Sequence, residues 1–144
     1  MKPFPHLYEV SAEAAEAGRV ELSAPGLATL ESDGPVEFDG PGDRWSPEML
    51  LVGAAADCFI LTFRAIARAS KLPWIRLSCG AKGTLDRVER ETRFTALELD
   101  AELVVPAGSD LDRARRLLEK AERGCLITSS LKLEPVLRAR VREP

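Results

Sequence analysis

The stretch that decides the fold is SPEMLLVGAAADCFILTFRAIARAS, residues 46–70. It follows the loop DGPGDRW and opens with strong helix-start signals. Ser46 can cap a helix, Pro47 suits the first helical position, and Glu48 adds negative charge to the first turn. The sequence therefore predicts a helix that begins near Ser46 and ends near residue 70.

The middle of this helix is apolar on nearly all sides. Residues 49–63 contain only Asp57 and Thr62 as strongly polar side chains, whereas a helix buried on one face shows a continuous polar stripe. We therefore expect a central helix covered on most sides. This apolar stretch is shorter than the roughly 20 residues that span a bilayer, and the start MKPFPHLYEV lacks the apolar core of a signal peptide. We expect a cytoplasmic protein without a membrane partner.

The segments on either side of the helix predict short strands and a second helix. RVELSA and LATLES precede the central helix and are separated by the turn signal Pro25-Gly26. After it, apolar and polar residues alternate in 75–82, 97–105 and 137–142, the period of strands with one buried face. A second helix is expected from Ser109 to Gly124. The order β-β-α-β-β-α-β predicts an α+β fold.

Two of these strands carry opposite charges on their outer faces. We expect them to be neighbours, because each oppositely charged cross-strand pair contributes roughly 0.2 to 1 kcal/mol. The charged residues are Glu98, Asp100 and Glu102 on one strand and Arg138, Arg140 and Arg142 on the other.

Length and composition are those of one ordinary globular domain. The chain has 144 residues and a mass of 15.7 kDa, so we treat 1–144 as a single domain. The net charge of −3 gives no electrostatic footprint for nucleic acid or for an anionic membrane. We expect neither partner.

The three cysteines, Cys58, Cys79 and Cys125, are widely spaced and odd in number, which does not suit a secreted disulfide framework. Cys79 falls on the apolar side of its strand and is interpreted as a small buried hydrophobe. Cys58, within an apolar helix, is open to a packing role or a catalytic one. With His6 the cysteines provide just enough ligands for zinc, but no pair has the short spacing of a recognisable metal site.

Two of the cysteine-bearing segments, SPEMLLVGAAADCFILTFRAIARASKL and AERGCLITSSL, together resemble the OsmC/Ohr family of thiol-dependent peroxidases. The similarity is closest along the predicted central helix, where Cys58 is followed by Phe59. The family's second reactive cysteine corresponds to Cys125, although the family often has proline directly after it and this chain has Leu126. The resemblance implies antiparallel sheets packed around a long central helix, in an intertwined homodimer.

The resemblance also implies a function. Cys58 would attack an organic hydroperoxide and become a sulfenic acid, and Cys125 would condense with it to a disulfide. An external dithiol, such as a lipoylated protein, would reduce that disulfide, with no metal or organic cofactor. The alternative is a binding or redox-sensing protein of the same fold without turnover.

A catalytic Cys58 needs a cation nearby, because an apolar environment raises the pKa of a thiol. The resemblance implies an arginine from the N-terminal strands held by a glutamate that matches Glu48. Arg19 is preferred, and Arg44 remains open. Glu48 and Cys58 are 10 residues apart, roughly 15 Å along one helix, so either Arg19 bridges the gap or Glu48 acts across a subunit interface.

The aromatic residues beside Cys58 suggest a substrate class. Phe59 and Phe63 are expected to favour an alkyl or fatty-acid hydroperoxide over hydrogen peroxide, which has no apolar part to bury.

Overall fold

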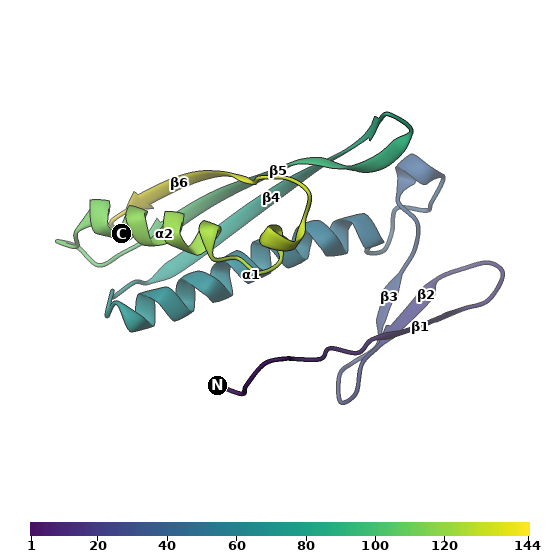
Figure 1. Cartoon of the computed structure of the whole chain (residues 1–144), viewed down its shortest axis with the longest axis horizontal. Coiled ribbons are helices and arrows are strands. Elements are labelled where there is room, and N and C mark those ends of the chain that lie inside the picture. Colours follow the sequence, from purple (N-terminus) through teal and green to yellow (C-terminus); the bar gives the residue numbers. More distant parts are fainter. The chain divides into compact units, whose positions relative to one another are not determined.

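The structure is a computed structural model that describes all 144 residues (Figure 1). The chain forms two compact units, residues 1–50 and 51–144. Its elements follow in the order β1 (Ser11–Ala14), β2 (Val20–Ser23), β3 (Leu30–Ser32), the 3-10 turn η1 (Val36–Phe38), α1 (Pro47–Ala69), β4 (Arg76–Val88), β5 (Glu91–Val104), α2 (Leu111–Arg123), the 3-10 turn η2 (Thr128–Ser130) and β6 (Val136–Arg142).

The first unit contains a three-stranded antiparallel sheet in the order β1-β2-β3. Strands β2 and β3 confirm the two predicted strands of this region. Strand β1, with the sequence SAEA, was not predicted. All four of its side chains are exposed, so it lacks the alternation between buried and polar residues that identifies a strand in a sequence.

Helix α1 begins where the sequence predicts. The Ser46 hydroxyl accepts a hydrogen bond from the backbone N–H of Met49 at 3.2 Å, and Pro47 is the first helical residue. The helix ends at Ala69, and Lys71 then adopts a left-handed backbone conformation with φ of 50°.

Within one chain, α1 is buried along a single stripe rather than on most sides. The fully buried residues recur every fourth position: Ala55, Phe59, Phe63 and Ala67. Leu61, on another face, is 50% exposed. The expected covering on most sides is therefore not supplied by this chain alone. By length and mean hydropathy (1.8), α1 could also cross a membrane, but a core helix meets the same criteria, so this property is weak evidence.

The second unit contains a sheet in the order β4-β5-β6. β4 and β5 form an antiparallel hairpin, whose tip residues Glu89 and Arg90 both have positive φ, 53° and 86°. β5 and β6 are parallel, so the expectation of purely antiparallel sheets is wrong here. The physical reason is that α2 lies between these two strands in the chain and returns it to the starting end of β5, as parallel neighbours require.

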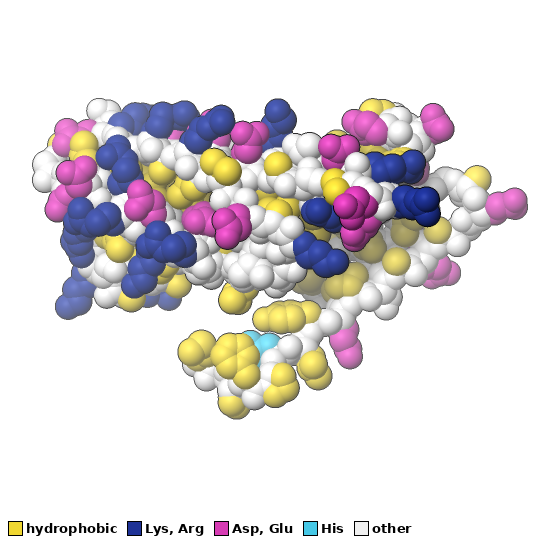
Figure 2. Space-filling view, turned by 45° about the horizontal axis from the view of Figure 1, so that its top comes forward, with side chains coloured by type: hydrophobic (Ala, Val, Ile, Leu, Met, Phe, Trp, Pro, Cys, Tyr) yellow, Lys and Arg dark blue, Asp and Glu magenta, His cyan; other side chains and the backbone are white.

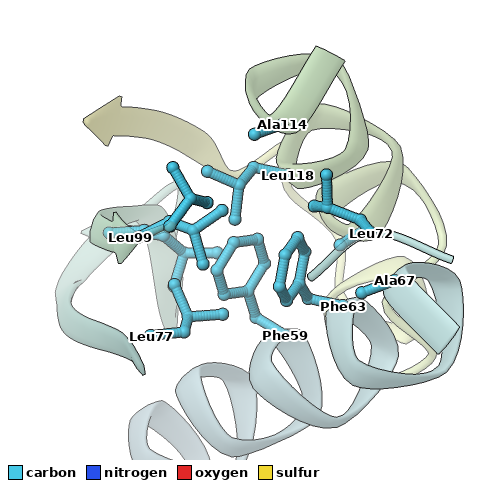
Figure 3. Packing of buried hydrophobic residues seen from close by; sticks show 12 residues of the cluster. Phe59, Phe63, Ala67, Leu72, Leu77, Leu99, Ala114 and Leu118 are labelled. Atoms are coloured by element: carbon cyan, nitrogen blue, oxygen red, sulfur yellow. The ribbon is translucent and has the colours of Figure 1, made fainter. Parts of the chain in front are cut away.

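Both helices of this unit pack on one face of the β4-β5-β6 sheet. Phe59 and Phe63 of α1 point toward Leu99 of β5 and Leu118 of α2, and all four side chains are fully buried (Figure 3). Phe63 also meets Trp74 edge to face, with ring centroids 5.6 Å apart. This core fixes the rotation of α1, and therefore the direction of Cys58, which directly precedes Phe59.

The opposite face of the sheet carries the predicted charge pairing, which the structure confirms. Basic and acidic side chains are interspersed on the molecular surface in Figure 2. The pairs between β6 and β5 are Arg138 with Glu98 at 3.1 Å, Arg140 with Asp100 at 3.2 Å and Arg142 with Glu102 at 3.2 Å. Because these side chains are exposed, each pair contributes little to stability, and their main effect is to favour this strand order.

Helix α2 begins at Leu111, two residues after the predicted start at Ser109. Asp110 is the capping residue, since its carboxylate accepts from the N–H of Arg113 at 2.9 Å. The hydroxyl of Ser109 instead donates to the carbonyl of Pro106. Gly124 terminates the helix as predicted, which brings Cys125 directly to its end.

Candidate functional site

Two of the predicted site residues, Cys58 and Cys125, come together in the second unit. Cys58 lies on α1 and is half-buried, whereas Cys125 follows α2 and is fully buried. Both are free thiols, and they lie close enough for each to shift the pKa of the other. Residues 67 positions apart in the chain therefore form one site.

A tight turn after α2 directs backbone N–H groups at the two sulfurs. The carbonyl of Cys125 accepts from the N–H of Ser129 at 3.1 Å and from the hydroxyl of Thr128 at 3.3 Å, which closes the turn. The N–H groups of Leu126 and Ile127 are oriented to lower the pKa of Cys58 by hydrogen bonding to its thiolate, and that of Thr128 acts on the pKa of Cys125 in the same way. A proline at position 126 would have no N–H to donate.

The Cys58 sulfur is also next to Thr62, one helical turn further along α1, with 3.8 Å between Sγ and Oγ1. Burial raises the pKa of Cys58, but four hydrogen-bond donors together outweigh this effect and lower it. In order of decreasing effect they are the N–H of Ile127, the Cys125 thiol, the Thr62 hydroxyl and the N–H of Leu126. The pKa of Cys58 therefore lies below its ordinary value of 9.0. This thiol is the more acidic member of the pair.

The other two cysteines are held in the protonated form. Burial raises the pKa of Cys125, and a Cys58 thiolate beside it raises this pKa further, while Thr128 opposes the shift. Burial, with smaller contributions from Asp100 and Cys125, raises the pKa of Cys79 to about 11. Cys79 is half-buried against the core, in agreement with its interpretation as a packing residue.

The remaining predicted site residues lie in the first unit. Arg19 pairs with Glu31 at 2.8 Å and with Glu21 at 3.5 Å. Arg44 pairs with the same Glu31 at 3.2 Å and with Asp43. Both candidate arginines therefore share one carboxylate, and neither pairs with Glu48.

Glu48 has a carboxylate oxygen, Oε2, that is buried without a hydrogen-bond partner. A buried carboxylate oxygen without a partner is costly, because it loses its contacts with water and receives no donor in return. Glu48 is thus free to hold a cationic side chain.

The zinc alternative is not assembled. No group of three or more histidine, cysteine, aspartate or glutamate residues is arranged to hold a metal ion. His6 instead contacts the carbonyl of Lys2 at 2.9 Å and stacks on Phe4. A hollow of about 410 Å³ between α2 and β6 is lined by no cysteine and is separate from this site: its residues are Arg115, Glu119, Glu122, Arg123, Leu137 and Ala139.

The arrangement is suited to thiol–disulfide chemistry. It places Cys58, a thiol of lowered pKa that readily forms the nucleophilic thiolate, beside a protonated thiol that can react with it after oxidation.

Sequence reasoning identified both cysteines but missed Thr62 and the donors at 126 and 127. Thr62 could have been found from its four-residue spacing to Cys58, but the backbone donors carry no side-chain signal.

Comparison with known proteins gives consistent results. The sequence profile of the family described as OsmC-like protein matches residues 40–139. YmaD, an uncharacterized protein of Bacillus subtilis, is 29% identical over 100 residues, 67% of each chain.

An OsmC-like protein of unknown function from Vibrio cholerae superposes with a TM-score of 0.86 at 16% identity, covering 94% of this chain and 100% of that one. An organic hydroperoxide resistance protein OsmC from Legionella pneumophila gives 0.75 at 23% identity, with 96% and 98% covered. The α+β arrangement of two sheets and two helices is therefore an OsmC-like fold.

Proposed function

Since the chain belongs to the OsmC-like protein family, we propose that it is a cysteine-based peroxidase that reduces organic hydroperoxides. One observation carries the proposal: Cys58, a half-buried thiol whose pKa is lowered, lies beside a second free thiol, Cys125, whose pKa is raised. The similarity in fold to a protein described as an organic hydroperoxide resistance protein supports the choice of reaction.

In the proposed reaction the Cys58 thiolate attacks one oxygen of the hydroperoxide. The O–O bond breaks, the alkoxide leaves and takes up a proton to become an alcohol, and Cys58 becomes a sulfenic acid. Cys125 then loses its proton and attacks the Cys58 sulfur, which releases water and forms a disulfide. An external dithiol, for which a lipoylated protein is our candidate, returns both thiols by exchange. No metal or organic cofactor takes part.

We assign Arg19 and Glu48 a role in activating Cys58. An arginine next to the thiolate would add to the hydrogen bonds already described and would lower the pKa of Cys58 further. The buried, unpartnered Oε2 of Glu48 supports this role, because it provides a place to hold a guanidinium. To pair with Glu48, Arg19 would have to give up its ion pairs with Glu31 and Glu21. If Arg19 keeps those pairs, Arg44 is the alternative arginine for this role.

We further propose that the protein acts as a homodimer in the cytoplasm. The unusual exposure of large apolar side chains supports a second copy as their cover, because such patches on one chain favour association. Leu61 and Met49 on α1 are 50% and 54% exposed. Hydrophobic side chains also surround the histidine near the N-terminus in Figure 2, where Phe4, Leu7, Tyr8 and Val10 are all highly exposed.

The aromatic residues beside Cys58 do not form the site for an alkyl group. Phe59 and Phe63 are fully buried in the core, so they cannot contact a substrate as the sequence suggested. The apolar side chains available near Cys58 are instead Leu126 and Ile127, which are 73% and 37% exposed on the turn that donates to its sulfur. We propose that these two side chains receive the alkyl group.

The test is hydroperoxide consumption with a dithiol reductant, comparing cumene hydroperoxide with hydrogen peroxide. We expect higher kcat/KM for cumene hydroperoxide, near-complete loss of turnover in Cys58→Ser and Cys125→Ser, and retention in Cys79→Ser. Leu126→Ser should lower kcat/KM for cumene hydroperoxide more than for hydrogen peroxide. No turnover in the reduced wild-type protein would favour a binding or redox-sensing function instead.

A further inference from the structure

Thr62 lies one helical turn after Cys58 on the same face of α1. Its Oγ1 is 3.8 Å from the Cys58 sulfur, and this is the hydrogen-bonding contact that the hydroxyl makes. A threonine within a helix commonly bonds the backbone carbonyl four residues earlier instead. Its orientation toward a sulfur is therefore a specific feature of this site.

The methyl group of Thr62 faces the other half of the site. It lies 3.5 Å from the position that a Cβ at Gly124 would occupy. Gly124 directly precedes Cys125, and its lack of a side chain leaves the end of α2 close to α1. Thr62 thus contacts Cys58 through its hydroxyl, and its methyl faces the open side of Gly124, next to Cys125.

We propose that Thr62 is a positioning residue for the reactive pair: its hydroxyl donates to the Cys58 thiolate while its methyl fills the space left open beside Gly124, next to Cys125. The catalytic consequence rests on the peroxidase function proposed above, whereas the contact with Cys58 does not.

The state of Cys58 decides the direction of this hydrogen bond. With a neutral thiol, either atom can be the donor. A thiolate has no proton, so the hydroxyl must donate, and a bond to a charged acceptor is stronger than a neutral one. Thr62 therefore stabilises the nucleophilic form selectively, in addition to the donors at Leu126 and Ile127.

The test compares Thr62→Val, which keeps the shape but removes the hydroxyl, with Thr62→Ser, which keeps the hydroxyl and removes the methyl. Thr95→Val is the matched control, because the Thr95 hydroxyl donates to the carbonyl of Thr84 in the β4–β5 hairpin. The measurement is the rate at which iodoacetamide labels Cys58 as a function of pH, read by peptide mass spectrometry.

We expect Thr62→Val to label Cys58 about two- to fivefold more slowly at pH 7, with the profile moved to higher pH and a plateau at high pH at least equal to that of the wild type, because a more basic thiolate is intrinsically more nucleophilic. Thr62→Ser should keep the wild-type pH profile, as should Thr95→Val. In the oxidation step, Thr62→Ser should form the Cys58–Cys125 disulfide more slowly, because it lacks the methyl that fills the space beside Gly124.

An unchanged pH profile in Thr62→Val would overturn the proposal. So would a Thr62→Ser profile that is shifted as far as the profile of Thr62→Val. If Thr62→Val does not fold by circular dichroism, Thr62→Ala provides the same comparison. Labelling needs no hydroperoxide, so the two proposals can fail independently. A shifted labelling profile in a protein that shows no peroxidase turnover would support the role of Thr62 and refute the peroxidase function.

Discussion

The pKa values of the three cysteines predict a strong selectivity in alkylation. At pH 9.0 more than half of Cys58 is thiolate, because its pKa lies below 9.0. Cys79, with a pKa of about 11, is then about 1% ionised, a ratio of at least about 50. The more basic thiolate is intrinsically about tenfold more nucleophilic for a pKa difference of two units, which leaves Cys58 about fivefold faster when its pKa lies just below 9.0.

Limiting iodoacetamide at pH 9.0, followed by peptide mass spectrometry, measures this ratio. Cys125 should also label more slowly than Cys58, since it is fully buried and its pKa is raised. Labelling in denaturant is the control, and there the three cysteines should react alike. Equal or faster labelling of Cys79 in the folded protein would refute the assignment of Cys58 as the acidic thiol.

Three further outcomes test the site and the fold. Leu126→Pro removes one N–H donor to Cys58, so its labelling should slow by about fivefold at pH 7, whereas Leu126→Ala keeps the donor and should match the wild type. Leu99→Ala, in the fully buried core, should lower the free energy of unfolding by about 3 kcal/mol in urea titrations, while Leu126→Ala changes it little. Arg90→Gly should raise that free energy by roughly 0.5 kcal/mol, because glycine adopts the observed φ of 86° without strain, and a loss would contradict the hairpin geometry.

Local signals in the sequence were sufficient for most of the elements. The cap at Ser46 and the proline after it predict the start of α1 because both act within a single helical turn. Alternation predicted β4 and β5, whose inner face enters the core. Strand β1 was missed because it pairs with β2 along one edge only and has no buried face, so its sequence does not alternate between apolar and polar residues.

Features that depend on distant segments were harder to predict. The direction of β6 depends on the path of α2, and strand patterns alone do not distinguish parallel from antiparallel pairing. Phe59 was assigned to a substrate pocket because its place next to Cys58 in the chain does not reveal that the two side chains point different ways. The meeting of Cys58 and Cys125 was expected from family resemblance and not from spacing.

The most direct measurement is the intact mass and thiol content of the reduced protein after one equivalent of cumene hydroperoxide, for the wild type and Cys125→Ser. The account predicts that the wild type loses two thiols and about two mass units within minutes, as a Cys58–Cys125 disulfide forms. Cys125→Ser should instead carry a sulfenic acid on Cys58 that dimedone traps. If neither protein changes mass, Cys58 is not a peroxidatic cysteine and the central claim is wrong.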